Sequence, residues 1–354
     1  MHGGDIYRNQ VEIDYSVNIN PLGVPESVEK ALMEAVKKCS CYPDIRAEKL
    51  ISAIAGMTGV EKEDLICGNG ASEMFCAIVR AVMPSKVLIP VPSFYGYQKV
   101  SMACCEEMIF YKMKKEDGFC LTKEFLDKLT ADVGMVFLAN PNNPTGQCIQ
   151  PELLEKILIK CRDYYIPVVL DECFIEFTGK GKEESYLRKI KEFPNLLVVR
   201  AFTKIFSIPG VRLGYLASSD EEMKQRIRKE LPEWNLSVFA QEAGAAAVKE
   251  REYLDRTITT VRQEREYLTE KLEEMQIQVF PSDTNFLLLY TTYPLAEKIL
   301  EEGILIRDCS NFEGLEEGYF RVAVKDRKNN EKLVHTIRQL MKKEGKEDGT
   351  FNDL

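Results

Sequence analysis

The sequence predicts an α/β protein in which a large domain with a mostly parallel central sheet is followed by a smaller α+β domain. Three observations lead to this prediction. The 354 residues exceed what one ordinary small domain needs. Short apolar runs alternate with amphipathic helical stretches from about residue 60 to residue 217. After Asp220 the pattern changes to long helical segments, then short strand-like runs and a final helix.

The alternating region provides the central sheet. Apolar runs that alternate with helices indicate parallel strands covered by helices on both faces, and ligands of such sheets bind beyond the carboxyl ends of the strands. We expect helices at Ser72–Val82 and at Pro151–Tyr164, the second opening with proline in a favourable first position. The predicted strands are Leu65–Cys67, Val87–Ile89, Met108–Tyr111, Met135–Leu138, Val168–Leu170, Leu196–Val199 and Leu213–Leu216.

The rest of the sequence predicts the smaller domain. Helix-forming sequence covers Glu221–Lys229 and Ser237–Met275, with a break near Glu250. The segments that follow are strands at Gln278–Phe280 and Asn285–Leu289, a helix at Pro294–Glu302, short strands around Leu305 and Phe320, and a helix at Asn329–Lys343. We therefore expect an N-terminal segment (1–35) that packs on the small domain, a large domain (36–245), a small domain (246–344) and a polar tail (345–354).

Composition and charge narrow the possible functions. A net charge of −9 argues against a nucleic-acid groove or an anionic membrane surface. Only two histidines are present, which disfavours Ser-His-Asp hydrolysis, zinc hydrolysis and histidine-based general base catalysis. Eleven cysteines without C-x-x-C spacing indicate reduced core residues, with no metal site; examples are Cys67, Cys76, Cys161 and Cys173. No run approaches the roughly 20 apolar residues of a membrane span and the start lacks signal-peptide features, so we expect a cytoplasmic protein.

Two charged residues follow strongly apolar strands. Lys204 is surrounded in sequence by Phe202, Ile205 and Phe206. Desolvation favours the neutral amine of a lysine, which can form an imine; the alternative is a surface lysine in a loop. Asp171 ends another apolar strand, where a buried carboxylate needs a hydrogen-bonding or cationic partner. A protonated pyridine nitrogen would be such a partner, and a helix cap or a structural ion pair is the alternative.

Two turns offer further ligand contacts. In the segment 140–146, two prolines and a glycine predict a rigid turn from which an asparagine amide can reach a ligand oxygen. The segment 68–73 joins a strand to a helix, and its glycines and helix N-terminus suit a phosphate. Glu73 stands where a dinucleotide fingerprint has its third glycine, so a nicotinamide-dependent dehydrogenase is disfavoured. Taken alone, each segment is an ordinary turn.

The order and spacing of these motifs resemble the fold-type I enzymes that depend on pyridoxal 5′-phosphate (PLP), specifically the class I/II aminotransferase superfamily, from about residue 2 to residue 340. The resemblance implies the fold-type I PLP-dependent transferase fold. It also implies that Lys204 carries PLP as a Schiff base and later moves a proton, while Asp171 pairs with the ring nitrogen. The other implied cofactor contacts are Phe94 on the ring face, Asn143 at the phenolic oxygen, Gly70, Ala71, Ser72, Thr203 and Arg212 around the phosphate, and Tyr42 reaching that phosphate from the partner subunit of a homodimer.

The resemblance extends to substrate contacts. Arg321 is implied to grip an α-carboxylate in a bidentate fork, and Arg307 to lie nearer a second anion. Asn20 and His2 are implied as further substrate contacts. The expected substrate is therefore a small phosphorylated amino acid or amine.

Several details favour the threonine-phosphate decarboxylase group within this superfamily. These are the opening His2-Gly3-Gly4, the segment 14–23, Phe174 where aminotransferases typically carry a tyrosine, and the segment 232–237. The implied reaction is decarboxylation of O-phospho-L-threonine to (R)-1-amino-2-propanol O-2-phosphate in cobalamin biosynthesis. Histidinol-phosphate aminotransferase, or a related class I/II aminotransferase, is the alternative. A non-catalytic sensor domain of a transcription regulator is disfavoured, because the chain has neither room nor charge for a DNA-binding segment.

Overall fold

The computed structural model describes residues 3–9, 11–181 and 183–347, and it confirms the α/β class. Its larger sheet has seven strands in the order β2-β8-β7-β6-β5-β3-β4. Strand β8 runs antiparallel to both of its neighbours, and the other pairs are parallel. The strands are β2 (Leu65–Gly68), β3 (Lys86–Val91), β4 (Glu107–Lys112), β5 (Met135–Ala139), β6 (Val168–Asp171), β7 (Leu196–Ala201) and β8 (Gly214–Ala217). Every strand predicted for this sheet is present.

Helices cover both faces of the large sheet because its strand residues alternate between two apolar cores. In β6, Val168 and Leu170 belong to one core, whereas Val169 belongs to the other. The first core receives α2 (Glu48–Thr58), α5 (Pro151–Asp163) and α8 (Val238–Ala247), and the second receives α3 (Ala71–Val82), α4 (Tyr95–Ser101) and α7 (Glu221–Lys229). Within the part of the chain that the structure describes, no helix has the length and apolar character needed to cross a membrane.

Short helical turns complete the large domain. The four-residue helix α6 (Phe202–Ile205) follows β7 directly. The 3₁₀ helices are η1 (Val36–Lys38), η2 (Lys62–Asp64), η3 (Lys123–Lys128), η4 (Ile175–Thr178) and η5 (Tyr186–Lys189).

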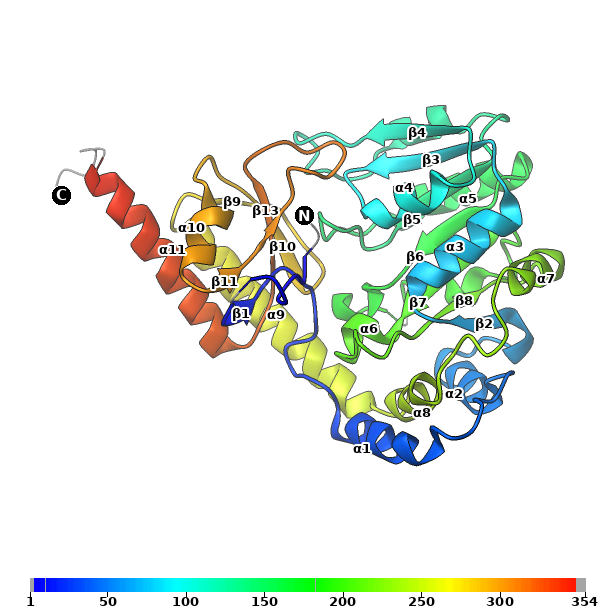
Figure 1. Ribbon diagram of the computed structural model, residues 1–354. Helices are drawn as coiled ribbons and strands as arrows, with labels where there is room; N and C mark the ends of the chain where they lie inside the picture. Colours follow the sequence, from blue (N-terminus) through cyan, green and yellow to red (C-terminus); the bar gives the residue numbers. More distant parts are fainter. Residues whose placement is uncertain (1–2, 10, 182, 348–354) are drawn as a thin grey trace.

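A second, antiparallel sheet lies to the left of the large sheet in Figure 1, in the strand order β12-β13-β10-β9. The strands are β9 (Gln278–Val279), β10 (Phe286–Tyr290), β12 (Arg307–Asp308) and β13 (Tyr319–Ala323). Its core also contains residues of α10 (Leu295–Glu301), of α11 (Arg327–Glu347) and of the end of the long helix α9 (Arg251–Glu273). The predicted helix break near Glu250 is confirmed, because α8 ends at Ala247 and α9 begins at Arg251.

The end of α11 differs from the sequence-based expectation. The predicted helix stops at Lys343 and a polar tail starts at residue 345, but α11 continues to Glu347. The added residues are mostly Glu and Lys, which form helices readily. Residues 348–354 of the predicted tail lie outside the described part of the chain.

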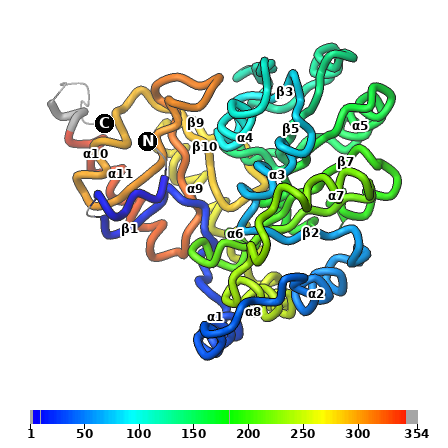
Figure 2. The backbone as a smooth tube through the Cα atoms, turned by 45° about the vertical axis from the view of Figure 1, so that its right-hand side comes forward, coloured from blue at the N-terminus to red at the C-terminus, as the bar shows by residue number. Residues whose placement is uncertain are grey.

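The N-terminal segment contacts both parts of the molecule. Strand β1 (Ile13–Asp14) pairs in parallel with β11 (Ile304–Leu305), and Tyr15 is buried in the core of the small sheet. Helix α1 (Glu26–Ala35) packs against α8, beside which it lies in Figure 1 and Figure 2. The segment therefore bridges the two sheets, while the domain boundaries themselves remain a prediction.

The interpretation of the cysteines as core residues is only partly right. Cys67, Cys161 and Cys173 are buried, whereas Cys76 is exposed. Cys76 lies on the outer side of α3, because the residues that α3 buries occupy the opposite side of that helix. Helical periodicity, rather than local hydrophobicity, decides the burial of this thiol.

Strand β8 fits between β2 and β7 only because residue 214 is glycine. A Cβ at Gly214 would lie 2.7 Å from Ala71 N and 3.0 Å from Arg200 O, both backbone atoms. We expect Gly214→Ala to lower the free energy of unfolding by about 1–3 kcal/mol, measured by urea denaturation. Gly210→Ala is the matched control, because nothing lies within 4 Å of a Cβ there; its effect should stay within about 0.5 kcal/mol. Equal effects of the two substitutions would contradict this account of the strand.

Candidate active site

The adjacent strands β6 and β7 bring Asp171 and Lys204 to the same region. The two strands are parallel, with Asp171 opposite Val199, and α6 carries Lys204 just beyond the end of β7. Burial raises the pKa of the Cys173 thiol well above its usual range; the Asp171 carboxylate raises it further and the Lys204 ammonium opposes the rise. The carboxylate and the amine therefore both lie close to Cys173.

Asp171 is a buried carboxylate held by neutral donors. Its Oδ2 accepts a hydrogen bond from Tyr97 Oη at 2.5 Å, and its Oδ1 accepts one from Cys173 N at 2.9 Å. Burial raises the pKa of Asp171. No residue of the described chain forms an ion pair with this carboxylate, so a cationic ring nitrogen would supply the missing countercharge.

Tyr97 is a site residue that the sequence analysis missed. Its ring stacks on Phe137 with centroids 4.9 Å apart and meets Phe75 edge-on at 5.3 Å. These contacts fix the hydroxyl that reaches Asp171, 74 residues away in sequence. The only signal in the sequence is the helical spacing of three between Phe94 and Tyr97, which does not reveal a distant carboxylate.

Phe94 stands at the start of α4, with its ring edge-on to Tyr97 at a centroid distance of 5.6 Å. A Cβ on Gly96 would lie 2.2 Å from Phe94 Cε1. The glycine thus leaves room for the Phe94 ring in this orientation.

Lys204 is partly buried among apolar and cationic neighbours. Burial, together with the nearby Arg321 and Arg212 guanidinium groups, lowers the pKa of Lys204 to about 8. Phe202 and Phe206, which flank the lysine in sequence, stack on each other at 5.4 Å. A substantial neutral fraction near neutral pH is what imine formation requires.

The start of α3 forms a cradle suited to an anion. Gly70 precedes the helix with φ +84°, and a Cβ there would lie 2.6 Å from Arg212 Nη2. The glycine therefore allows the guanidinium to approach the helix N-terminus, where the first-turn amides of Ala71 and Ser72 have no partner within the helix. Thr203 is buried in α6 next to Lys204, and its phosphate contact remains a prediction.

Two buried arginines lie opposite each other on β12 and β13. Arg307 is paired with Arg321 in the antiparallel register. Arg321 donates from Nη1 to Asn143 Oδ1 and from Nη2 to Ser16 O at 2.7 Å, while its buried Nε has no hydrogen-bond partner in the described chain. Arg307 donates from Nη2 to Asn311 Oδ1 at 2.8 Å. Burial lowers the pKa of Arg321 to about 10, which the more distant Asp14 carboxylate opposes only in part.

Three predicted contacts stand apart from this arrangement. Asn20 donates from Nδ2 to Ile205 O, in the segment after Lys204, and to Thr257 Oγ1 in α9. Both N–H groups of its side-chain amide therefore have partners within the chain, and its substrate contact remains a prediction. Tyr42 is 81% exposed and contacts Trp234 at a ring distance of 4.9 Å. His2 lies outside the described residues.

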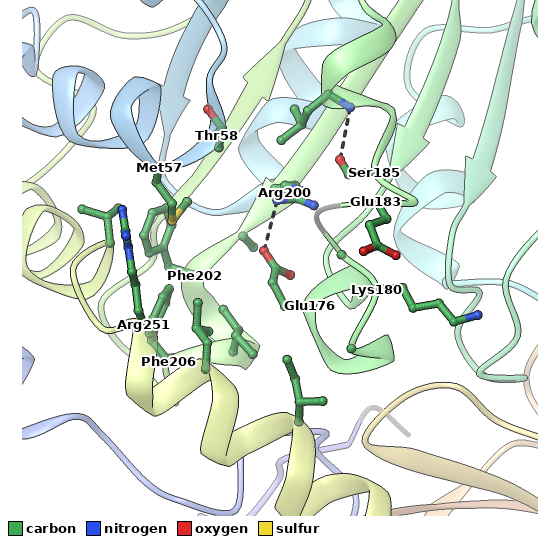
Figure 3. Close-up of a pocket in the computed structure, with 18 of the residues that line it drawn as sticks. Met57, Thr58, Glu176, Lys180, Glu183, Ser185, Arg200, Phe202, Phe206 and Arg251 are labelled. Atoms are coloured by element: carbon green, nitrogen blue, oxygen red, sulfur yellow. Dashed lines mark hydrogen bonds and ion pairs between the residues drawn. The ribbon is translucent and has the colours of Figure 1, made fainter.

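Arg200 forms a buried charge cluster close to these groups. It donates from Nε to Glu172 Oε2 at 3.1 Å. Its Nη1 lies 3.3 Å from Glu176 Oε1, as Figure 3 shows. A cavity of about 500 Å³ adjoins this cluster and is also lined by Phe202 and Phe206. None of the predicted cofactor or substrate residues lines that cavity, so we do not assign it to the active site.

Comparison with known proteins places the chain in a family. The sequence profile described as aminotransferase class I and II matches residues 11–337. The chain belongs to this family. The enzymes of the family depend on PLP, and the fold of this family member is that of fold-type I PLP enzymes.

Relatives of this aminotransferase-family protein have two different names. A protein of Caldanaerobacter subterraneus subsp. tengcongensis, which carries threonine-phosphate decarboxylase as a provisional name, is 40% identical over 96% of this chain and 93% of its own length. The threonine-phosphate decarboxylase of Salmonella typhimurium is 33% identical, covering 96% of each chain. The crystal structure of the histidinol-phosphate aminotransferase from Clostridium acetobutylicum matches with a TM-score of 0.87 at 31% identity, covering 93% of this chain and 98% of that one.

The residues present fit PLP. Asp171 lacks a countercharge, Lys204 has a lowered pKa, and the start of α3 with Arg212 suits a phosphate. These groups match the ring nitrogen, the aldehyde and the phosphate of the cofactor respectively. The family member therefore retains the chemistry that its cofactor needs.

The lowered pKa of Lys204 predicts its reactivity in the enzyme without cofactor. Below its pKa of about 8 the neutral fraction falls about tenfold per pH unit. We expect acetic anhydride labelling of Lys204, followed by peptide mass spectrometry, to reach half its maximum near pH 8. Arg321→Met removes a neighbouring cation and should move this midpoint upward. A midpoint near 10.5, the usual value for lysine, would contradict the buried position of the amine.

Proposed function

We propose that this protein is a PLP-dependent decarboxylase that converts O-phospho-L-threonine to (R)-1-amino-2-propanol O-2-phosphate in cobalamin biosynthesis. The observation that carries the proposal is the pair of buried arginines, Arg307 and Arg321, on adjacent strands. One substrate with both a carboxylate and a phosphate would occupy both guanidinium groups, whereas histidinol phosphate has no carboxylate. The names of the relatives at 40% and 33% identity support the same substrate.

In this proposal Arg321 orients the substrate. Its guanidinium lies between Asn143 Oδ1 and Ser16 O, so its direction is set before substrate binds. We assign the α-carboxylate to Arg321 and the phosphate to Arg307. Binding energy from the remote phosphate would then be used to set the angle of the carboxylate.

PLP, when bound, withdraws electrons from whichever bond at the substrate's Cα stands perpendicular to its ring. The chain's own groups then decide the outcome. Arg321 holds the carbon–carbon bond to the carboxylate in that direction, so CO₂ leaves and the bonding electron pair stays at Cα. Lys204 delivers a proton to this carbon, and Asp171, held by Tyr97, keeps the proton on the ring nitrogen.

We assign the remaining predicted cofactor contacts to PLP on the same basis. The assignment places Phe94 on the ring face and Asn143 at the phenolic oxygen. The phosphate would be held by the cradle that the sequence predicts at Gly70, Ala71, Ser72, Thr203 and Arg212.

Phe174 also supports decarboxylation. The side chain is buried, and its ring centroid lies 5.1 Å from that of Phe286. The class I/II aminotransferases that this chain resembles typically carry at this position a tyrosine that contacts the cofactor ring. A phenylalanine has no hydroxyl to hydrogen-bond a cofactor oxygen or to shuttle a proton.

Incubation of the holoenzyme with O-phospho-L-threonine under anaerobic conditions tests the reaction. We expect released CO₂ without pyridoxamine phosphate, because a decarboxylase returns its cofactor unchanged. Arg321→Lys keeps the charge but loses the bidentate hydrogen bonding of a guanidinium to a carboxylate. It should therefore lower kcat/KM by roughly 100-fold. Lys204→Ala should give no turnover. Stoichiometric pyridoxamine phosphate would refute the proposed reaction.

Transamination of histidinol phosphate with 2-oxoglutarate is the second candidate. The TM-score of 0.87 with a histidinol-phosphate aminotransferase favours it. The two guanidinium groups would then bind the two carboxylates of 2-oxoglutarate. Formation of glutamate from this substrate pair, absent with O-phospho-L-threonine, would establish this function instead.

We further propose that the active site is completed in a homodimer. Tyr42 is 81% exposed, as a side chain that serves a partner subunit has to be in an isolated chain. Large apolar side chains are exposed nearby in the sequence, namely Met33, Val36 and Ile45, and Trp234 contacts the Tyr42 ring. Such residues are typical of a surface that a second copy covers.

Mixed dimers test whether Tyr42 acts across the interface. We expect Tyr42→Ala and Lys204→Ala to be nearly inactive separately at limiting PLP. Random exchange of equal amounts should restore about a quarter of the wild-type activity, because each hybrid dimer has one intact site of two. Activity equal to the mean of the separate variants would show that Tyr42 serves its own chain.

A further inference from the structure

The dipeptide Gly3-Gly4 packs directly against Ser16. Gly4 N donates to Ser16 Oγ at 2.7 Å, and Gly4 has φ +85°. A Cβ on Gly3 would lie 2.5 Å from Ser16 O, which is closer than real Cβ atoms approach a backbone oxygen. The contact therefore requires glycine at position 3 and strongly favours it at position 4.

Ser16 is itself held rigidly. Both Ser16 N, at 2.8 Å, and Ser16 Oγ, at 2.6 Å, donate to Asp14 Oδ1. The hydroxyl thus donates its only proton to Asp14 and accepts a hydrogen bond from Gly4 N through a lone pair. Asp14 belongs to β1, which is anchored to β11. The position of Ser16 is therefore set by the pairing of β1 with β11.

The carbonyl group of Ser16 also holds Arg321. Arg321 Nη2 donates to Ser16 O at 2.7 Å, and its Nη1 donates to Asn143 Oδ1. The Arg321 Nε is buried and has no partner within the described chain. Two oxygens therefore fix the direction of this guanidinium, and one of them is the atom that Gly3 approaches.

We propose that Gly3 and Gly4 form a latch that docks the N-terminal segment on Ser16 and, through the Ser16 carbonyl, positions Arg321 for the carboxylate of the substrate. The latch rests on the proposed role of Arg321. A side chain at position 3 pushes the N-terminal segment away from the Ser16 carbonyl or displaces that carbonyl. Both changes alter the surroundings of the Arg321 guanidinium. Gly3 and Gly4 are positioning residues, since their own contacts are with Ser16.

Ligands with and without a carboxylate separate positioning from general damage. In Gly3→Ala holoenzyme, titrated by cofactor absorbance, we expect the Kd for O-phospho-L-threonine to rise about tenfold, the effect of weakening one charged hydrogen bond. The Kd for O-phosphoethanolamine, which lacks the carboxylate, should stay unchanged. Gly56→Ala is the control, because a Cβ there meets nothing within 4 Å; both of its Kd values should match the wild type. Equal weakening of both ligands in Gly3→Ala would overturn the proposal.

Trypsin cleavage after Arg8 tests the latch without any substrate. The Arg8 side chain is 83% exposed, so cleavage depends on how readily the surrounding backbone detaches. We expect at least tenfold faster cleavage in Gly3→Ala and in Ser16→Ala than in wild type or Gly56→Ala. Unchanged cleavage in Gly3→Ala would refute the docking. If wild-type protein fails to bind O-phospho-L-threonine, the proposed substrate is wrong, and the cleavage rates still decide whether the latch exists.

Discussion

The geometry of the candidate active site depends on the buried ion pair between Arg200 and Glu172. Neighbouring residues of an extended strand point to opposite faces, so Asp171 meets Tyr97 on one side of the sheet while Glu172 meets Arg200 on the other. Glu172 also accepts hydrogen bonds from Ser185 Oγ and from Tyr186 N, each at 2.7 Å. Removing one partner of such a pair leaves an uncompensated buried charge, at a cost of about 3–5 kcal/mol. The ion pair therefore keeps the ends of β6 and β7 in one register, and with them Asp171 and Lys204.

Asp171 and Arg321, which we assign to the ligands, differ from Arg200 and Glu172 in their charge pairing. Within the described chain Asp171 has no cationic partner, and Arg321 has no carboxylate partner. Burial without a countercharge raises the pKa of Asp171 and lowers that of Arg321 and of Lys204. The fold thus bears an electrostatic cost. On the proposed assignment, the cofactor and the substrate would relieve this cost when they bind, which would couple ligand binding to stability.

The N-terminal segment connects the two parts of the molecule. Strand β1 extends the small domain, Ser16 reaches Arg321, and Asn20 anchors the backbone after Lys204. A short stretch of chain therefore contacts both the residue assigned to the substrate carboxylate and the segment of the reactive lysine. This placement gives the proposed latch a route from the first described residues to a site built mainly by the large sheet.

The sequence by itself determined the strands of the large sheet, the helix break near Glu250 and the turns that carry Gly70 and Asn143. These features follow from local hydrophobic periodicity and from the backbone preferences of glycine and proline. The motif order also predicted the family. Only the tertiary structure decided that Tyr97 holds Asp171, that Arg200 holds Glu172 and that Ser16 holds Arg321. The partners in these pairs lie 74, 28 and 305 residues apart, and no local pattern specifies which distant donor meets which acceptor.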